Sequence, residues 1–462
     1  MLYRKGRIGE RVESAGIVNQ LSVEGDMDRR SFLIRTGLLM GTAMLAAAGT
    51  GCETPQVRRR REGYKNWTVV RNEFLLDRNK IHMTGFLLAS HPAPVREAIE
   101  RHRQGLDEDP ATYWAEREET GEAEVLAAAA DYLGVSATDI ALTDSTTMGL
   151  GLLYGGLTLT QGQESLSTIH DHYSTDTSLR LRAERTGASF RQIPLYKDLK
   201  TVTQEEIVRT LVSEVRPETR YVAVTWVHSS TGLKLPIRAI ADALAKINGS
   251  RGEQDRVLLC VDGVHGLGVE NVKLPDLGCD FFVAGTHKWM FGPRGTGLVW
   301  GRPHAWPLAQ ATIPTFDSTA YRMWMKDSPE HAIHHAALMT PGGFHSFEHR
   351  WALNEAFTFH QIIGKARVTE RIYELNQQLK QGLVKIPRVT LRTPMSQDLS
   401  AGIVCFEIEG MKPHRVVEKL KEDKIIASVS PYAVQYVRLA PGLLNTPGEV
   451  DVVLRAIRDL AV

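Results

Sequence analysis

Two residues of this 462-residue chain, Asp262 and Lys288, have the types and the spacing that a cofactor-dependent active site needs. Asp262 directly follows the apolar run 257–261, and Lys288 follows the next run, 281–284, in a loop rich in glycine. Open α/β sheets place their ligand groups at such strand ends. Pyridoxal phosphate needs a lysine for covalent attachment and an acidic partner for its ring nitrogen. Spacing alone leaves a second interpretation open, an exposed lysine and a capping aspartate.

Hydrophobic periodicity predicts the elements that would position these two residues. Short, nearly continuous apolar runs are typical of strands buried on both faces of a mostly parallel sheet, and they occur at 221–227, 257–261, 281–284 and 297–300. Apolar residues at helical spacing predict helices at 236–247, 368–383 and about 413–423. Strand-like segments lie between the last two helices, at 389–393 and 401–410. The alternation predicts a large α/β domain over 64–325 and a smaller α+β domain over 326–462.

The segment 262–297, DGVHGLG…DFFVAGTHKWMFGPRGTG, resembles the cofactor-lysine region of the class V aminotransferase family. Other motifs of that family follow in the expected order, at 72–99, 144–153, 170–175 and 437–451. The isopenicillin N epimerase-like branch is the most similar in look, at HKW (287–289) and at 72–99. The resemblance implies a fold-type-I pyridoxal phosphate enzyme with a mostly parallel, seven-stranded type of sheet. It also implies a homodimer.

The resemblance implies a role for each residue around the cofactor ring. Lys288 would hold the cofactor and move the substrate's α-proton, and Asp262 would pair with the ring nitrogen. His172 would stack on the ring, with His170 as the competing candidate. His265 and Ser229 would lie near the ring oxygen.

The same resemblance implies residues for the two ends of the site. Thr146 and Thr147, at a predicted helix start, would hold the phosphate together with His287. Gly285 stands where relatives often carry a serine, so one phosphate contact is expected to be missing or replaced. Arg438 would bind a substrate carboxylate, for which the planar guanidinium suits bidentate contact. Gly343, in PGGF (341–344), stands near the place where a loop of the neighbouring subunit would reach the phosphate.

Cysteine placement argues against one activity of the family. Cysteine desulfurases need a nucleophilic cysteine on a loop before the C-terminal arginine motif, and 425–442 contains none. Cys260, Cys279 and Cys405 lie in or beside strand-like apolar runs, so we predict buried, inert thiols. The reactions that remain are transamination, racemisation or epimerisation, and β- or γ-elimination. We expect an aminotransferase or an epimerase acting at the α-amino carbon, with a C–S or other β-elimination lyase as the alternative. We therefore expect a small substrate of the amino-acid type.

The N-terminal residues are typical of an export signal. Arg29 and Arg30 precede a short apolar stretch at 38–48, and DRRSFLIR resembles the twin-arginine signal. We predict an extra N-terminal extension over 1–26, a signal over 27–52 and a linker over 53–63. Cys52 is a candidate for lipid attachment. The protein would then use the twin-arginine export machinery and reside in the periplasm or another extracytoplasmic space.

Composition excludes one class of partner and leaves two rival functions. The chain has 55 Lys plus Arg against 54 Asp plus Glu, a net charge of +1, which offers no basic field for nucleic acid. HSFEH (345–349) fits the H-x-x-E-H pattern of zinc peptidases, although no third ligand stands out. We expect no metal ligand among the site residues. A non-catalytic binding protein of the same fold is the other rival, but Lys288, Asp262 and Arg438 are all present.

Overall fold

The computed structural model describes residues 55–326 and 333–462. The predicted extension, export signal and Cys52 lie outside the described residues. From Arg59 onward the chain forms one compact unit. The predicted boundary between 325 and 326 stays a prediction. Among the described helices, none has both the length and the apolar character that crossing a membrane requires.

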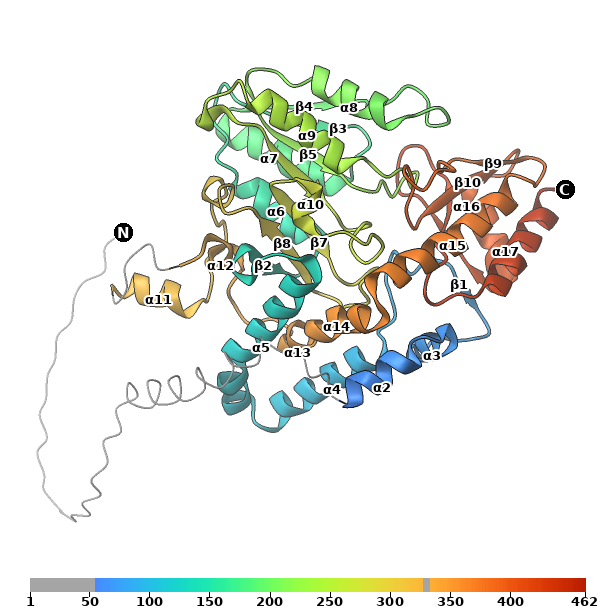
Figure 1. The fold of residues 1–462 in the computed structure, drawn as a ribbon, viewed down its shortest axis with the longest axis horizontal. Coiled ribbons are helices and arrows are strands. Elements are labelled where there is room, and N and C mark those ends of the chain that lie inside the picture. Colours follow the sequence, from blue (N-terminus) through green and yellow to red (C-terminus); the bar gives the residue numbers. More distant parts are fainter. Residues whose placement is uncertain (1–54, 327–332) are drawn as a thin grey trace, which may run out of the picture. The chain divides into compact units, whose positions relative to one another are not determined.

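A seven-stranded sheet forms the centre of the large part of the molecule (Figure 1). Its strand order is β2-β8-β7-β6-β5-β3-β4. The strands are β2 (Ile140–Thr143), β3 (Glu164–Thr168), β4 (Ser189–Ile193), β5 (Thr219–Thr225), β6 (Leu258–Asp262), β7 (Phe281–Gly285) and β8 (Gly297–Gly301). This mostly parallel sheet confirms the predicted fold class. Only β8 runs against its neighbours β7 and β2, because the loop 286–296 is too short for the crossover that a parallel pair needs.

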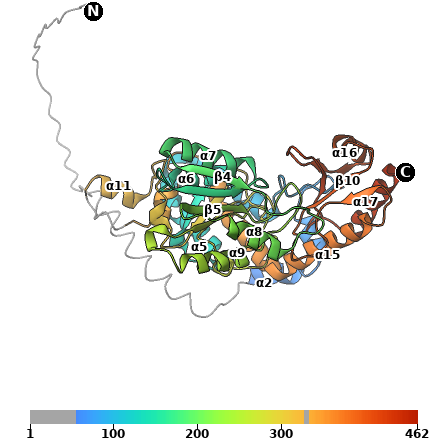
Figure 2. The ribbon, with the colours of Figure 1, turned by 90° about the horizontal axis from the view of Figure 1, so that it is seen from above.

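Helices cover both faces of this sheet, as Figure 2 shows with α6 and α7 on one side and α8 and α9 on the other. Their bounds are α6 (Thr146–Gly156), α7 (Tyr173–Thr186), α8 (Gln204–Ser213), α9 (Ile237–Asn248) and the short α10 (Leu274–Leu277). The core under α6 is apolar: Leu150 and Leu153 are fully buried in one cluster with Val283 and Val299. Burial of this kind holds the start of α6 against the ends of β7 and β8.

Helices from distant parts of the sequence pack together beside the sheet. α13 (Phe347–Trp351) and α14 (Leu353–Ile363) contact α4 (Ala93–Glu108) and α5 (Pro110–Leu133), side by side in Figure 1. Trp351 is completely buried there and leaves no room for a side chain at Gly121. The remaining helices of this part are α2 (Pro55–Gly63), α3 (Trp67–Asn72), α11 (Ser318–Trp324) and α12 (His335–Met339).

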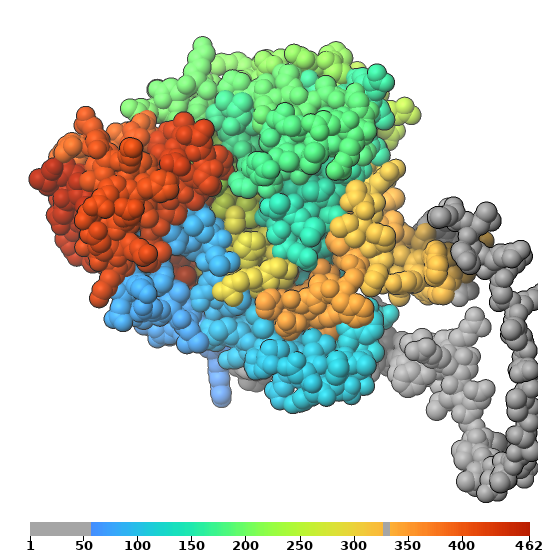
Figure 3. All heavy atoms as spheres, turned by 180° about the vertical axis from the view of Figure 1, so that it is seen from behind, coloured from blue at the N-terminus to red at the C-terminus, as the bar shows by residue number. Residues whose placement is uncertain are grey.

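A four-stranded antiparallel sheet, ordered β12-β13-β10-β9, forms the C-terminal part with helices packed on it. Its elements are α15 (Lys365–Leu383), β9 (Val389–Leu391), β10 (Val404–Ile408), α16 (Pro413–Glu422), β12 (Ser428–Val429), β13 (Val437–Leu439) and α17 (Pro447–Leu460). The N-terminal strand β1 (Ile81–His82) pairs with β11 (Ile425–Ile426), so the blue and red segments of Figure 3 lie together. This pairing brings 83–91 to the edge where the predicted site lies.

Candidate active site

The predicted site residues follow strand ends of the large sheet. Asp262 is the last residue of β6, Lys288 comes three residues after β7, and His172 four residues after β3. Ser229 follows β5, and Thr146 begins the helix after β2. Because the carboxyl ends of parallel strands meet at one edge, the fold itself gathers these side chains.

Lys288 lies among these strand-end side chains and has few hydrogen-bond partners. Its Nζ is 3.4 Å from Nε2 of His265, the one hydrogen-bond partner of this amine within the described chain. Burial lowers the pKa of Lys288 to about 8, against the opposing effect of Asp262 and with help from Arg438. A substantial fraction of the amine is therefore neutral near pH 8, as a nucleophile or base must be.

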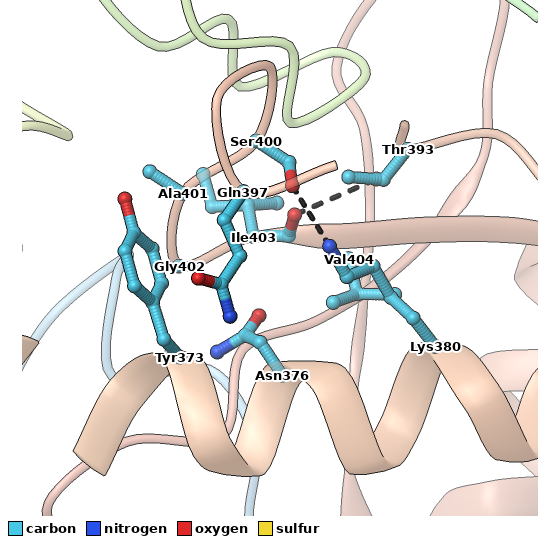
Figure 4. A pocket seen from close by; sticks show the side chains of 10 residues that line it. All are labelled: Tyr373, Asn376, Lys380, Thr393, Gln397, Ser400, Ala401, Gly402, Ile403 and Val404. Atoms are coloured by element: carbon cyan, nitrogen blue, oxygen red, sulfur yellow. Dashed lines mark hydrogen bonds between the residues drawn. The ribbon is translucent and has the colours of Figure 1, made fainter. Parts of the chain in front are cut away.

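Two further lysines, Lys365 and Lys380, also have a pKa that burial lowers to about 8. Their amines, however, have two and three hydrogen-bond acceptors, respectively. Lys365 donates to two backbone carbonyls, and Lys380 donates to two carbonyls and to Ser400 Oγ at 2.8 Å. Figure 4 shows Lys380 extending from α15 to Ser400 beside a cavity of about 10 Å³, far too small for a cofactor. Lys288 is the lysine of the three that lacks such acceptors.

Asp262 is the buried carboxylate of the site. One of its oxygens accepts the backbone N–H of Val264 at 3.1 Å, and no described group donates to the other. Burial raises the pKa of Asp262 to about 6, although Val264 and Lys288 oppose the shift. A protonated ring nitrogen opposite the free oxygen would stabilise the carboxylate.

His265 is buried between Lys288 and two aromatic side chains. Its Nδ1 accepts the indole N–H of Trp289 at 3.4 Å, so Nε2 carries the proton and points at Lys288. Its ring centre is 5.9 Å from that of Phe86. Burial, reinforced by Lys288, holds the pKa of His265 well below its usual range. A neutral histidine that donates from Nε2 suits the predicted contact with the ring oxygen.

His172 and His170 have different surroundings. His172 caps α7, and its Nδ1 accepts the N–H of Ser174 at 3.2 Å. Burial, and then Lys288, lowers the pKa of His172, so it belongs to the same electrostatic group. His170 instead stacks on Tyr196, with ring centres 4.4 Å apart, and accepts a backbone N–H. These contacts favour His172 over His170 for the predicted stacking role.

Thr146, Gly285 and His287 converge at a place that fits a phosphate. Gly285 donates its N–H to Thr146 Oγ1 at 2.8 Å, and a Cβ at Gly285 would lie 3.0 Å from the His287 ring. The first two residues of α6 are Thr146 and Thr147, and the cap is Ser145, so their own N–H groups have no intrahelical acceptor. His287 Nδ1 is buried and lacks a partner in the described chain. An anion would satisfy the N–H groups of Thr146 and Thr147 and the Nδ1 of His287, while Gly285 already donates to Thr146.

Arg438 is buried, and its orientation is fixed by three donated hydrogen bonds. Its acceptors are Ser428 Oγ at 3.2 Å, the Ser229 carbonyl at 3.0 Å and the Val429 carbonyl at 3.1 Å. The guanidinium also lies 4.8 Å from the centre of the Phe86 ring. The arrangement presents a rigid cation to the site, as a carboxylate-binding arginine requires.

Thr147 and Gly343 have fewer contacts with the other predicted site residues. Thr147 Oγ1 contacts Ser174 Oγ at 3.0 Å, which links α6 to α7. Gly343 has a φ of 106°, a backbone conformation that favours glycine. Within the described chain, no hydrogen bond joins it to Thr146, Gly285 or His287. Its contact from a neighbouring subunit stays a prediction.

Tyr432 and Phe86 lie at the site but are not among the predicted site residues, although Phe86 falls within the motif at 72–99. Tyr432 contacts Ser229 and His172, and Phe86 lies against Arg438 and His265. Phe86 follows a two-residue strand, and Tyr432 lies in a short loop between two short strands. Neither segment has the periodicity that marks longer elements.

The HSFEH motif is not arranged as a zinc site. His345 lies before helix α13, so it does not share a helical face with His349, whose Nδ1 lies 2.8 Å from the Arg294 carbonyl. Among residues 55–326 and 333–462, no group of three or more His, Cys, Asp or Glu side chains is placed to hold a metal ion. The zinc-peptidase interpretation has no geometric support.

The three cysteines of the described chain are buried, as predicted. Burial raises the pKa of Cys279 and Cys405 to about 12, and that of Cys260 well above its ordinary value. Thiols with such a pKa are poor nucleophiles near neutral pH.

Comparison with known proteins agrees with this geometry. The model of the aminotransferase class-V family matches residues 116–439, and the chain belongs to that family. Pyridoxal phosphate is therefore the cofactor, and Lys288, Asp262, Thr146 and His287 are the residues predicted to hold it. When bound, it withdraws electrons from the bond that breaks at the substrate's α-carbon.

Individual relatives are distant and differ in activity. A probable cysteine desulfurase of Halalkalibacterium halodurans is 28% identical, over 65% of this chain and 70% of its own. The isopenicillin N epimerase of Streptomyces clavuligerus is 26% identical, over 84% of this chain and 96% of its own. The cystine C–S lyase C-DES, solved as a variant with glycine linked to its pyridoxal phosphate, has a TM-score of 0.75 at 22% identity, covering 84% and 99% of the two chains. This last likeness shows the fold.

Proposed function

We propose that this pyridoxal phosphate enzyme acts at the α-amino carbon of an amino acid, or of a metabolite that contains one, as an aminotransferase or an epimerase. The observation that carries the proposal is Lys288, a lysine with a pKa of about 8 and no tight acceptor, beside Asp262 and Arg438. Arg438 would bind the substrate carboxylate and so direct the α-hydrogen toward Lys288. Lys288 would accept that proton, and Asp262 would keep a positive charge on the ring nitrogen.

Several curated relatives are cysteine desulfurases, and the cysteines argue against that activity here. A desulfurase of this kind needs a cysteine thiolate at the substrate, and the described cysteines are buried with raised pKa values. The epimerase relative also spans more of both chains than the first desulfurase does. The proposal therefore favours chemistry that needs no protein thiol.

Elimination by a C–S lyase is the second candidate. It begins with the same removal of the α-proton, so Lys288 and Asp262 would serve it equally well. This candidate is supported by the fold similarity to C-DES, a cystine C–S lyase. The nature of the substrate's β-substituent, and not the lysine, would separate this reaction from epimerisation.

We propose further that the enzyme is exported and forms a homodimer. The support for export is the pair Arg29 and Arg30 before a short apolar stretch. The support for a dimer is exposed aromatic surface, since Trp324 and Phe344 are 80% and 79% exposed. A partner loop near Gly343 would then reach the phosphate. Cys52 stays a candidate for a lipid anchor.

The proposal is tested by incubating the holoenzyme with amino acids, cystine included, in deuterated water. We expect deuterium at the α-carbon of the substrate. A retained visible cofactor band with formation of the other enantiomer would identify an epimerase, and bleaching with an oxo-acid product an aminotransferase. Pyruvate with persulfide from cystine would identify the lyase. Sulfur transfer to a cysteine of this chain would contradict the proposal.

A further inference from the structure

The hairpin loop between β12 and β13 carries a tyrosine into the site. Ser430 and Tyr436 close this loop, because Ser430 donates its N–H to the Tyr436 carbonyl at 2.9 Å and Ser430 Oγ accepts the Tyr436 N–H at 2.8 Å. Pro431, Ala433 and Val434 are exposed, whereas Tyr432 is half-buried. The closed loop therefore holds one side chain inward while its neighbours face solvent.

The Tyr432 side chain contacts two residues of the predicted site. Its hydroxyl is 2.7 Å from Ser229 Oγ, and its ring stands edge-on to His172 with centres 6.3 Å apart. Burial raises the pKa of Tyr432, so the hydroxyl keeps its proton near neutral pH. A protonated hydroxyl can donate one hydrogen bond and accept others.

Arg438 also binds Ser229, through the backbone carbonyl and not through the hydroxyl. A guanidinium has five N–H donors, and three of those of Arg438 are used by Ser229, Ser428 and Val429. Two donors, one on each terminal nitrogen, remain for a ligand. Because Ser229 binds Arg438 through its carbonyl and Tyr432 through its hydroxyl, the two groups are held at a spacing set by one residue.

We propose that Tyr432 is a substrate-binding residue that donates a third hydrogen bond to the carboxylate bound by Arg438. Ser229 Oγ then donates to the Tyr432 oxygen, and the Tyr432 proton is free to point at the carboxylate. This chain of donors leaves every hydroxyl satisfied once an anion is present. The proposal rests on the proposed function, since it assumes that the ligand at Arg438 is an amino-acid carboxylate.

The test compares Tyr432→Phe with Tyr436→Phe in the holoenzyme. Both substitutions remove one hydroxyl from the same loop, but the Tyr436 ring lies against Arg392, 5.4 Å away, and within the described chain no side-chain hydrogen bond or ring contact joins it to a predicted site residue. The probe is propionate, a carboxylate without an amino group, and its dissociation constant is measured from the perturbation of the cofactor's visible band. KM and kcat are measured separately once a substrate is known.

We expect Tyr432→Phe to weaken propionate binding by about 10- to 100-fold, as the loss of a hydrogen bond to a charged group does. KM should rise by a similar factor with little change in kcat. Tyr436→Phe should change binding by less than about twofold. Equal propionate affinity in wild type and Tyr432→Phe, equal weakening in both variants, or no propionate binding to cofactor-loaded wild type would each overturn the role of Tyr432. Failure of the wild type to take up pyridoxal phosphate would instead contradict the proposed function.

Discussion

Lys288→Ala is expected to abolish both cofactor attachment and turnover. The variant removes the one lysine at the strand ends whose amine has a lowered pKa and no tight acceptor. It removes the base as well, so turnover should fall by about 10⁴-fold, the upper end of what a positioned base contributes. The measurement is the visible spectrum after addition of pyridoxal phosphate, followed by turnover with the best substrate. Partial recovery of the rate on adding a small primary amine would fit the base role.

The matched control for this variant is Lys246→Ala, which removes an exposed lysine from the end of α9. It should keep the visible band and full turnover. Thermal unfolding of both variants without cofactor checks that the fold is kept. A normal visible band and normal turnover in Lys288→Ala would place the attachment at another lysine and contradict the assignment.

Asp262→Asn is expected to separate cofactor loading from catalysis. The amide has the shape of the carboxylate but no charge, so it cannot stabilise a protonated ring nitrogen. Turnover should fall by roughly 10²- to 10³-fold, the range seen when one electrostatic partner of a transition state is lost. Loading should persist, because Lys288, Thr146 and His287 are unchanged. Turnover and cofactor content are measured on the same preparation.

The same variant should also change the pH dependence of cofactor attachment. Asp262 raises the pKa of Lys288, against the larger effect of burial. Without that charge the pKa falls, the amine becomes neutral at lower pH, and the midpoint of the attachment rate should move to lower pH. Asp276→Asn, at an exposed aspartate of α10, is the control and should shift nothing. Wild-type turnover in Asp262→Asn would contradict the assigned role.

Much of the site could be predicted because its residues follow strands with strong local signals. The runs before Asp262 and Lys288 are buried strands, as their apolar composition indicates, and parallel strand ends meet at one edge. Thr146 and His287 meet for the same reason, at Gly285. Thr146 and Thr147 are the first residues of α6, at the predicted helix start, and Ser145 caps the helix.

What could not be predicted depends on contacts between segments distant in sequence. Tyr432 reaches Ser229 across 203 positions, and β1 pairs with β11 through only two residues each. Such contacts are decided by tertiary packing and leave no period in the sequence. The antiparallel direction of β8 follows from the length of one loop, which a run of apolar residues does not show.

The most direct test of the central claim, that Lys288 holds pyridoxal phosphate, is to locate the cofactor on the chain. The holoenzyme is reduced with borohydride, digested, and its peptides are analysed by mass spectrometry. We expect the cofactor's mass on the peptide that contains Lys288. Its attachment to Lys365 or Lys380, the two other lysines with a pKa of about 8, would contradict the claim, as would reduction that leaves no modified peptide.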